Sequence, residues 1–209
     1  MSGLNGYEFG KRVLDLAGAG VGLLVSSPLL VLIMWRARSK LGRPSLFRHE
    51  RAGRHGLPFD VLKIRTMTDE RDEAGALLPD ADRLTPFGQT LRSASIDELP
   101  QLWNVLRGEM SLVGPRPLPM RYVNRYSVHQ RRRLDVKPGL TGWAQIQGRN
   151  LTSWPDRLEQ DVWYVDNRSF VLDLKILWRT IGVVLARRGV SAEGQATMEE
   201  FFGEGEGAG

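Results

Sequence analysis

Two adjacent carboxylates, Asp97 and Glu98, are the residues of this chain whose types and placement best suit chemistry. They stand just before an apolar run with helical spacing, where neighbouring side chains point about 100° apart. One carboxylate can then hold a cation while the other faces a substrate, which suits phosphoryl chemistry. Aspartate is ionised at neutral pH, so it can attack phosphorus if nearby cations neutralise the phosphates.

The same pair also has a purely structural interpretation. Ser95 and Glu98 have the spacing of a capping box, and Asp97 in a first helical turn would complement the helix dipole. Spacing alone favours capping over catalysis. A catalytic role therefore depends on support from other residues.

Basic residues that could neutralise phosphates occur at several places along the chain, and the candidates are Lys63, Arg65, Arg92, Arg116 and Arg149. Arginine presents a planar fork of donors that matches phosphate oxygens. Taken one at a time, each of these residues is more typical of an ordinary surface charge. The glycine-rich segment 137–150 could bring backbone amides close to a phosphate, or could simply form two turns around a short strand.

Composition limits the classes of function. The 209 residues allow one domain with a core, or one domain and a membrane segment, and hence a single site. The net charge of +5 indicates an anionic partner without identifying it. The absence of cysteine excludes disulfides, cysteine metal sites and cysteine nucleophiles, and the three histidines lack the spacing of metal ligands.

The segment from Val13 to Trp35 is the most apolar part of the sequence and is a membrane candidate. As a straight helix it would be roughly 30 Å long, enough to cross a bilayer core. Basic residues flank both ends, so neither end is favoured for the far side of the membrane. Pro28 breaks a helical hydrogen bond and Ser27 can bond a nearby carbonyl, which favours a helix that enters, bends and returns. An ordinary transmembrane helix and a signal peptide are the alternatives.

The remainder has the character of a soluble domain. The patterns predict a strand over 58–67, a charged loop or exposed helix over 68–83, a helix over 99–106 ended by Gly108, a rigid turn over 114–117, a basic helix over 120–134 and an amphipathic helix over 172–188. That last helix suits either a membrane surface or a protein core. We expect an α-rich α/β fold with three parts: a membrane-associated segment over 1–40, a catalytic domain over 41–188 and a flexible tail over 189–209.

A set of motifs in a fixed order resembles the bacterial sugar transferase family, the monotopic phosphoglycosyl transferases. The resemblance runs from about Lys11 to Val184, and its motifs are Ser27-Pro28, Lys63-Ile64-Arg65-Thr66-Met67, Leu91-Arg92, Asp97-Glu98-Leu99-Pro100-Gln101, Asn104-Val105, the stretch 110–117, the stretch 137–142, Gly148-Arg149-Asn150 and Asp161-Val162-Trp163-Tyr164. Any one motif is weak evidence, whereas the ordered set is specific.

The resemblance implies a two-step reaction on a small monotopic domain. Asp97 would attack the β-phosphate of a UDP-sugar and release UMP, and the phosphosugar would then pass to undecaprenyl phosphate. Glu98 would bind Mg²⁺, while Lys63, Arg92 and Arg149 match the basic positions of the family's active site. Arg116 lies in a supporting turn, and Ser27-Pro28 matches the kink of a re-entrant helix.

The resemblance also implies a location and partners. We expect the cytoplasmic face of a bacterial inner membrane, with membrane lipid and no nucleic acid as partner. The chain resembles the minimal catalytic unit of the family, so downstream glycosyltransferases would be separate proteins, and a homo-oligomer is left open. Two other functions are weighed: a metal-dependent glycosyltransferase that releases UDP, and a non-catalytic basic protein that binds membrane. Neither the sugar nor the glycan pathway is indicated; exopolysaccharide, capsule, O-antigen and glycoprotein glycan all remain.

Overall fold

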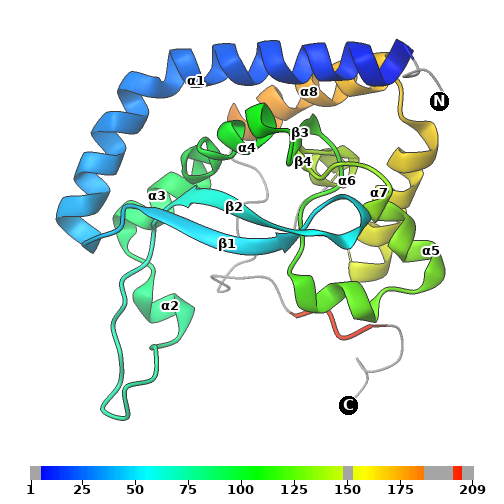
Figure 1. The fold of residues 1–209 in the computed structure, drawn as a ribbon. Coiled ribbons are helices and arrows are strands. Elements are labelled where there is room, and N and C mark those ends of the chain that lie inside the picture. Colours follow the sequence, from blue (N-terminus) through cyan, green and yellow to red (C-terminus); the bar gives the residue numbers. More distant parts are fainter. Residues whose placement is uncertain (1–5, 148–152, 186–199, 204–209) are drawn as a thin grey trace.

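The computed structural model describes residues 6–147, 153–185 and 200–203, and it is rich in helix (Figure 1). Its α-helices are α1 (Gly6–Leu41), α2 (Asp80–Arg83), α3 (Pro86–Ser93), α4 (Gln101–Arg107), α5 (Val128–Arg131), α6 (Trp143–Gln147), α7 (Trp154–Asn167) and α8 (Phe170–Leu185). Short 3₁₀ helices are η1 (Arg54–Gly56), η2 (Ile96–Glu98), η3 (Met120–Arg125) and η4 (Arg132–Leu134). The strands are β1 (Leu46–Ala52), β2 (Pro58–Ile64), β3 (Ser111–Val113) and β4 (Gly139–Thr141). The expected helix-rich fold with a few short strands is confirmed.

Helix α1 is a single helix of 36 residues with Pro28 inside it. Figure 1 shows that α1 changes direction partway along its length. The Ser27 hydroxyl donates to the Leu24 carbonyl at 2.8 Å and the Ser26 hydroxyl donates to the Gly22 carbonyl at 2.6 Å. These bonds hold the turns that precede the proline, as the sequence predicted. By length and hydropathy α1 could cross a membrane, and little of its apolar stretch is buried in the protein.

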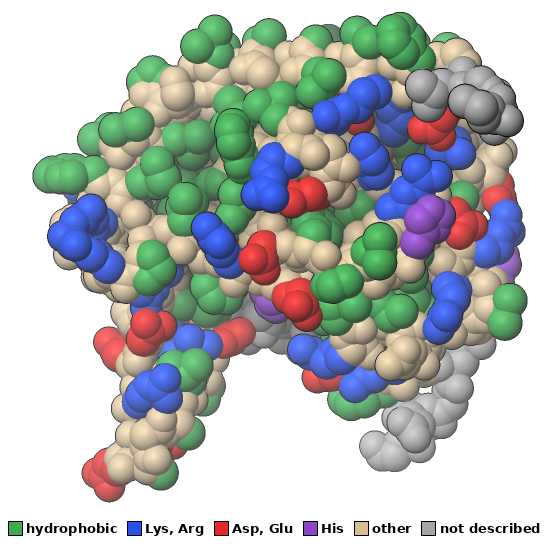
Figure 2. Space-filling model, viewed as in Figure 1, with side chains coloured by type: hydrophobic (Ala, Val, Ile, Leu, Met, Phe, Trp, Pro, Cys, Tyr) green, Lys and Arg blue, Asp and Glu red, His purple; other side chains and the backbone are tan. Residues whose placement is uncertain are grey.

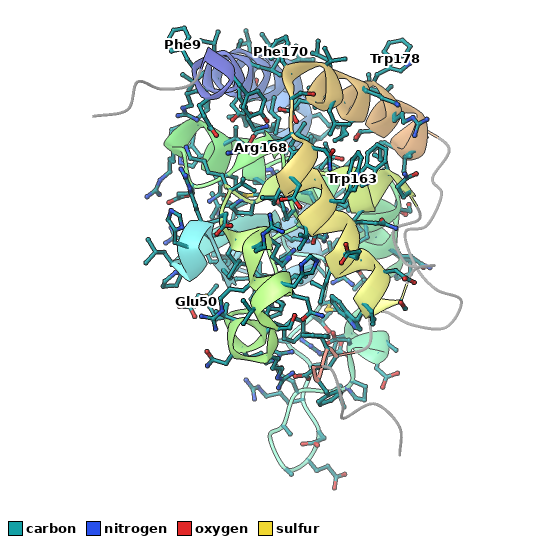
Figure 3. All side chains as sticks on the ribbon, turned by 90° about the vertical axis from the view of Figure 1, so that its right-hand side faces the viewer. Phe9, Glu50, Trp163, Arg168, Phe170 and Trp178 are labelled. Carbon is teal, nitrogen blue, oxygen red and sulfur yellow. The ribbon has the colours of Figure 1, made fainter. Side chains whose placement is uncertain are left out.

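The exposed side chains of α1 and α8 form an apolar edge of the molecule. Figure 3 shows Phe9 of α1 together with Phe170 and Trp178 of α8 projecting from this edge. Figure 2 shows hydrophobic side chains along α1, with charged groups gathered over the middle of the same view. The apolar edge also holds exposed Val21, Leu24, Val25, Val31, Leu32, Trp35, Val171, Leu174 and Ile181. This distribution suits burial in lipid.

The inner side of α1 is fastened to the rest of the protein by buried polar contacts. Lys11 forms an ion pair with Asp173 of α8 at 2.7 Å. Asp15 accepts hydrogen bonds from the Ser111 hydroxyl at 2.9 Å and the Leu112 amide at 2.8 Å. Arg12 donates to two carbonyls at the end of α4 at 2.8 and 2.9 Å. The sequence indicates Lys11 and Arg12 as basic residues that precede the apolar segment, and the structure shows that the charges of both are used inside the protein.

The strands form two small sheets. Strands β1 and β2 are an antiparallel hairpin in which Phe47 pairs with Lys63, His49 with Val61 and Arg51 with Phe59. Strands β3 and β4 are parallel. Gly114 and Gly139 approach so closely behind these strands that a Cβ on Gly139 would lie 2.1 Å from the Gly114 amide nitrogen. This approach fixes the beginning of the 114–117 turn.

Three hydrophobic clusters hold the elements together. The first joins α1, α4, β2, β3 and α8, with Val105, Met110 and Ile176 fully buried. The second lies beneath η3, and the third packs the distal half of α1 against α3 and the end of β2. The third cluster brings Ile64 and Leu91 together, and these residues directly precede two of the candidate site positions, Arg65 and Arg92.

The predicted strand over 58–67 corresponds to β2, and the helix over 99–106 corresponds to α4, which ends at Gly108 with a φ of +82°. The region 68–83 is a loop ending in the short helix α2, as predicted. The predicted basic helix over 120–134 is wrong, because this region is divided into η3, α5 and η4. Ser127 starts α5 with a capping box to Gln130, which breaks the helical path.

Most of the predicted C-terminal tail lies outside the described residues. Its described part, residues 200–203, packs against η3. Phe201 is 3% exposed among aromatic side chains, and the carboxylate of Glu200 accepts hydrogen bonds from Arg121 and Arg125 at 2.9 and 2.8 Å.

Candidate active site

Asp97 and Glu98 lie in η2, a tight turn between α3 and α4. The predicted capping box is wrong. Ser95 adopts a left-handed conformation with a φ of 55°, and its side chain makes no capping hydrogen bond. The Glu98 carboxylate turns toward other elements of the protein instead. The pair is therefore free for a role beyond helix capping.

Glu98 is held by two cations from different parts of the chain. Lys63 Nζ lies 2.8 Å from Glu98 Oε1, and Arg116 Nη2 lies 2.6 Å from the same oxygen. Arg116 Nη1 also approaches Glu98 Oε2 at 3.5 Å. These charges hold the pKa of Glu98 well below its usual range in spite of burial.

Asp97 has the opposite surroundings. It is 5% exposed, yet within residues 6–147, 153–185 and 200–203 its carboxylate has no hydrogen bond or ion pair. Burial raises the pKa of Asp97 to about 6; the charge of Glu98 adds to this rise, while Lys63, Arg92 and Arg116 oppose it. A carboxylate without hydrogen bonds, beside several cations, is suited to attack an electrophilic phosphorus atom.

The cations reach the carboxylates from separate elements. Lys63 is at the end of β2, where cross-strand pairing fixes its direction. Arg116 belongs to the 114–117 turn, and its carbonyl accepts a 2.7 Å hydrogen bond from the buried Arg133. Arg133 is in turn paired with Asp161 of α7 at 2.7 Å. The turn that supplies Arg116 is thus supported from behind by an ion pair of the core.

Arg92 reaches the site from α3. Its Nε donates to the Thr66 hydroxyl at 3.0 Å, and its charge acts on Asp97. Helix α3 can approach Thr66 because Gly88 has no side chain, since a Cβ there would lie 1.9 Å from the Thr66 carbonyl oxygen. The structure therefore brings Lys63, Arg92 and Arg116 around the pair, as the sequence predicted.

Arg65, another predicted phosphate-binding residue, is engaged with partners other than the carboxylate pair. Arg65 donates to the Met67 carbonyl at 3.1 Å and to the Arg43 carbonyl at 3.3 Å, and it pairs with Asp69. Its guanidinium is occupied in fixing the loop that follows β2. Arg149 lies outside the described residues. The phosphate-binding roles of all five candidate basic residues stay predictions.

Other charged residues near the site were not predicted. Arg51 and the neutral His49 are on β1 and Arg121 is on η3. Lys63 and Arg121 act on His49, and Arg116 and Arg121 act on Arg51. Residues 47–51 alternate in a way that could have indicated a strand. The sequence does not give the register of the hairpin, so it could not place these residues beside Lys63.

A divalent cation can be tested against this set of donors. In the described part of the chain, no cluster of three or more His, Asp or Glu side chains could enclose a metal. Mg²⁺, however, is usually held by one or two carboxylates together with substrate phosphates and water. Glu98 supplies one such carboxylate, so it fits a magnesium ion whose coordination substrate phosphates and water would complete.

The fold and the site together define a class: a small helix-rich protein with a long apolar helix and a carboxylate centre ringed by cations, suited to group transfer between phosphates. The sequence profile of the bacterial sugar transferase family matches residues 6–187, and the chain belongs to this family. It is accordingly a transferase.

Its relatives agree with this assignment. The chain is 53% identical over 196 residues to a Bacillus subtilis protein named "Uncharacterized sugar transferase EpsL", covering 94% of this chain and 97% of that protein. It is 42% identical to the UDP-glucose:undecaprenyl-phosphate glucose-1-phosphate transferase of Caulobacter vibrioides, covering 84% of this chain and 69% of that enzyme. It is 37% identical to the undecaprenyl-phosphate galactose phosphotransferase of Salmonella typhimurium, covering 87% of this chain and 42% of that longer enzyme.

Proposed function

We propose that this protein transfers a sugar-1-phosphate from a UDP-sugar to undecaprenyl phosphate and releases UMP, through a covalent phosphosugar on Asp97. The observation that supports this most directly is the contrast within the pair. Glu98 is held by Lys63 and Arg116, whereas the buried Asp97 carboxylate beside it forms no hydrogen bond or ion pair with a described residue. The reactions named for the Caulobacter and Salmonella relatives are of the same kind.

In the first step, a carboxylate oxygen of Asp97 attacks the β-phosphorus of the donor. A phosphorus–oxygen bond forms to Asp97, and the bond from the β-phosphorus to the oxygen it shares with the α-phosphorus breaks. That oxygen leaves with the electron pair as part of UMP. Lys63, Arg92 and Arg116 carry the positive charge that lets an anion approach the pyrophosphate.

In the second step, a phosphate oxygen of the polyprenyl acceptor attacks the same phosphorus. The bond to Asp97 breaks, the carboxylate is regenerated, and the sugar is left on a lipid-linked diphosphate. Because Asp97 and then the acceptor attack the same phosphorus, one cationic pocket can serve both steps.

We further propose that Mg²⁺ binds at Glu98 and at the substrate phosphates. When bound, it would neutralise phosphate charge and stabilise the transferring group. Lys63 and Arg116 hold Glu98 in position and supply positive charge at the same point.

The acceptor carries a long lipid tail, so the site has to lie at a membrane surface. The apolar edge formed by α1 and α8 supports this location (Figure 3). We propose that α1 enters the bilayer and returns at its bend, leaving the protein on the cytoplasmic face of the inner membrane. Basic residues in the last turns of α1 and just after it favour that face, and they are Arg36, Arg38, Lys40 and Arg43.

The test is product analysis with detergent-solubilised protein, Mg²⁺, undecaprenyl phosphate and a panel of UDP-sugars. Wild type should release UMP with at least one sugar. Asp97→Asn removes the nucleophilic charge and should lower this release by a factor of about 10³ or more, as expected for loss of a covalent catalyst.

The matched control is Asp82→Asn, a substitution of the same type at an exposed position of α2. It should retain the wild-type rate. Release of UDP in place of UMP would indicate transfer of the sugar alone, and near-normal UMP release by Asp97→Asn would exclude Asp97 as the nucleophile.

A further inference from the structure

A row of side chains, formed by Lys63, Phe47, His49 and Arg51, extends from the carboxylate pair along one face of the β1–β2 hairpin. In this antiparallel register Phe47 is opposite Lys63, and Phe47, His49 and Arg51 alternate onto the same face. Arg51 lies four residues beyond the position opposite Lys63, a distance of roughly 13 Å along the strand. The row thus begins at Lys63, which holds Glu98, and continues along β1 to Arg51.

Arg51 is the member of this row whose charge is not balanced. It is half-buried, and its contact within the described ranges is a hydrogen bond from Nη2 to His49 Nδ1 at 3.1 Å. Burial and the nearby cations lower the pKa of His49 to about 4, so His49 is neutral at physiological pH and accepts this bond without balancing the charge. No described carboxylate pairs with Arg51.

The neighbouring cations make the unpaired charge of Arg51 energetically unfavourable. The pKa of Arg51 is lowered to about 10, mainly by burial and then by the charges of Arg116 and Arg121. Those two neighbours have carboxylates of their own, since Arg116 is paired with Glu98 and Arg121 with Glu200. Buried charges are normally paired, so an unpaired one beside two further cations indicates a place for an anion.

The backbone around Arg51 is firmly held. The Ala52 amide, directly after Arg51, donates to the Leu118 carbonyl at 2.9 Å and so joins the end of β1 to the segment that follows Arg116. The backbone at Arg51 is therefore tied to the segment that carries Arg116, while His49 orients the guanidinium of Arg51 and Glu98 that of Arg116. A phosphate placed between them would meet two preset guanidinium groups at little cost in conformational entropy.

We propose that Arg51, oriented by His49, binds a substrate phosphate other than the one under attack at Asp97. The proposal rests on the proposed transfer reaction, in which two reactants bring such a group: the α-phosphate of the UDP-sugar and the phosphate of the polyprenyl acceptor. The chemistry recognised is the same in both cases, and kinetics distinguishes the source.

The experiment compares wild type with Arg51→Gln, varying the UDP-sugar at saturating undecaprenyl phosphate and then the reverse. Loss of a charge-assisted hydrogen bond to phosphate should raise one of the two KM values about tenfold or more, with a smaller effect on kcat. A rise for the donor assigns the α-phosphate, and a rise for the acceptor assigns the lipid phosphate. The control is Arg48→Gln, an exposed arginine on the opposite face of the same strand, and it should change neither value more than twofold.

Three further variants keep the test decisive. Arg51→Lys retains the charge but not the fork and should show a smaller rise in the same KM, which covers the case in which Arg51→Gln fails to fold. His49→Gln retains an acceptor and should resemble wild type, whereas His49→Leu should resemble Arg51→Lys. If the folded Arg51 variants keep both KM values, or lose only thermal stability, the inference is wrong. That result is distinct from failure of the proposed function, which would appear as UMP release that does not depend on Asp97.

Discussion

Asp97 and Glu98 are adjacent in the chain, yet the fold gives them different electrostatic surroundings. Lys63 and Arg116 approach Glu98 and stabilise its charge, while Asp97 is buried without a hydrogen bond from any described residue. The pKa of Asp97 is raised and that of Glu98 is lowered. Such a separation assigns different roles to two like groups. Glu98 stays an anion that organises cations, and Asp97 is a carboxylate whose charge is easily used for bond formation.

This difference predicts the pH dependence of the first step. Asp97 attacks as the carboxylate, and its pKa of about 6 lies above the usual value, so the reactive form is present at pH 7 and is lost as the pH falls through about 6. The rate of UMP release from the donor alone, measured from pH 5 to 8, should show this acid limb, and bound Mg²⁺ should move it to lower pH. A rate that increases on acidification would contradict the assignment.

At the residue scale, the sequence predicted the carboxylate pair and three of the cations that surround it. It could not predict which partner each carboxylate has, because those contacts join positions as distant as Lys63 and Glu98, or Glu98 and Arg116. The capping box had the correct spacing but was wrong, because the left-handed conformation of Ser95 turns the side chains elsewhere.

At the scale of elements, the site depends on how closely α3 approaches the end of β2. Gly88 makes that approach possible, and Arg92 follows one turn later on the same helix. The packing of one small residue thus sets the position of a cation beside Asp97.

Gly88→Ala should therefore impair both stability and activity. The added methyl would meet the Thr66 backbone at 1.9 Å, which forces α3 outward at a cost of about 1–3 kcal/mol in the free energy of unfolding and displaces Arg92. Thermal unfolding and the rate of UMP release are the measurements. Gly182→Ala in α8, with no atom within 4 Å of the new methyl, is the control and should be neutral or slightly stabilising. Equal behaviour of the two variants would refute this account of α3.

The C-terminal segment gives a second test at this scale. Phe201 is 3% exposed and lies 5.5–5.9 Å from the rings of Trp154, Tyr122 and Tyr126, whereas Phe202 is 54% exposed. Phe201→Ala should destabilise the docked segment by up to about 3 kcal/mol, and Phe202→Ala by less than about 1 kcal/mol. Limited proteolysis near the C-terminus should distinguish them. Equal protection of both variants would show that Phe201 does not anchor the segment.

Among the elements, those with strong local signals were predictable. Gly108 ends α4 and alternating residues form β2, because turns and periodicity act over a few positions. The pairing of β1 with β2, the division of 120–134 and the docking of Phe201 were not predicted. Each depends on which distant surface covers the segment, and a single sequence does not contain that information.

At the scale of the whole molecule, the membrane helix and the catalytic part form one body. Lys11, Arg12 and Asp15 of α1 reach α8, α4 and β3, and the Lys11–Asp173 pair is almost fully buried. The site is thus held at a fixed position relative to the apolar edge. Lys11 and Asp173 are 162 positions apart, so this connection could not be read from the sequence.

Removing one charge of the Lys11–Asp173 ion pair should strongly destabilise the protein. Asp173→Leu leaves the Lys11 ammonium buried without its counter-charge, and the loss in the free energy of unfolding should be about 3–5 kcal/mol. The double variant Lys11→Met with Asp173→Leu removes both charges and should recover much of that loss. Thermal unfolding in detergent measures both. A double variant no better than the single one would show that the charge pair is not the cause.

The central claim is that Asp97 itself becomes bonded to the transferred phosphate, and intact-mass analysis tests it most directly. Protein incubated with the UDP-sugar and Mg²⁺, without acceptor, should gain the mass of one sugar phosphate, located by digestion to the peptide that contains Asp97. Addition of undecaprenyl phosphate should remove it. If the protein releases UMP during turnover but never carries this adduct, direct transfer between the substrates would replace the covalent mechanism.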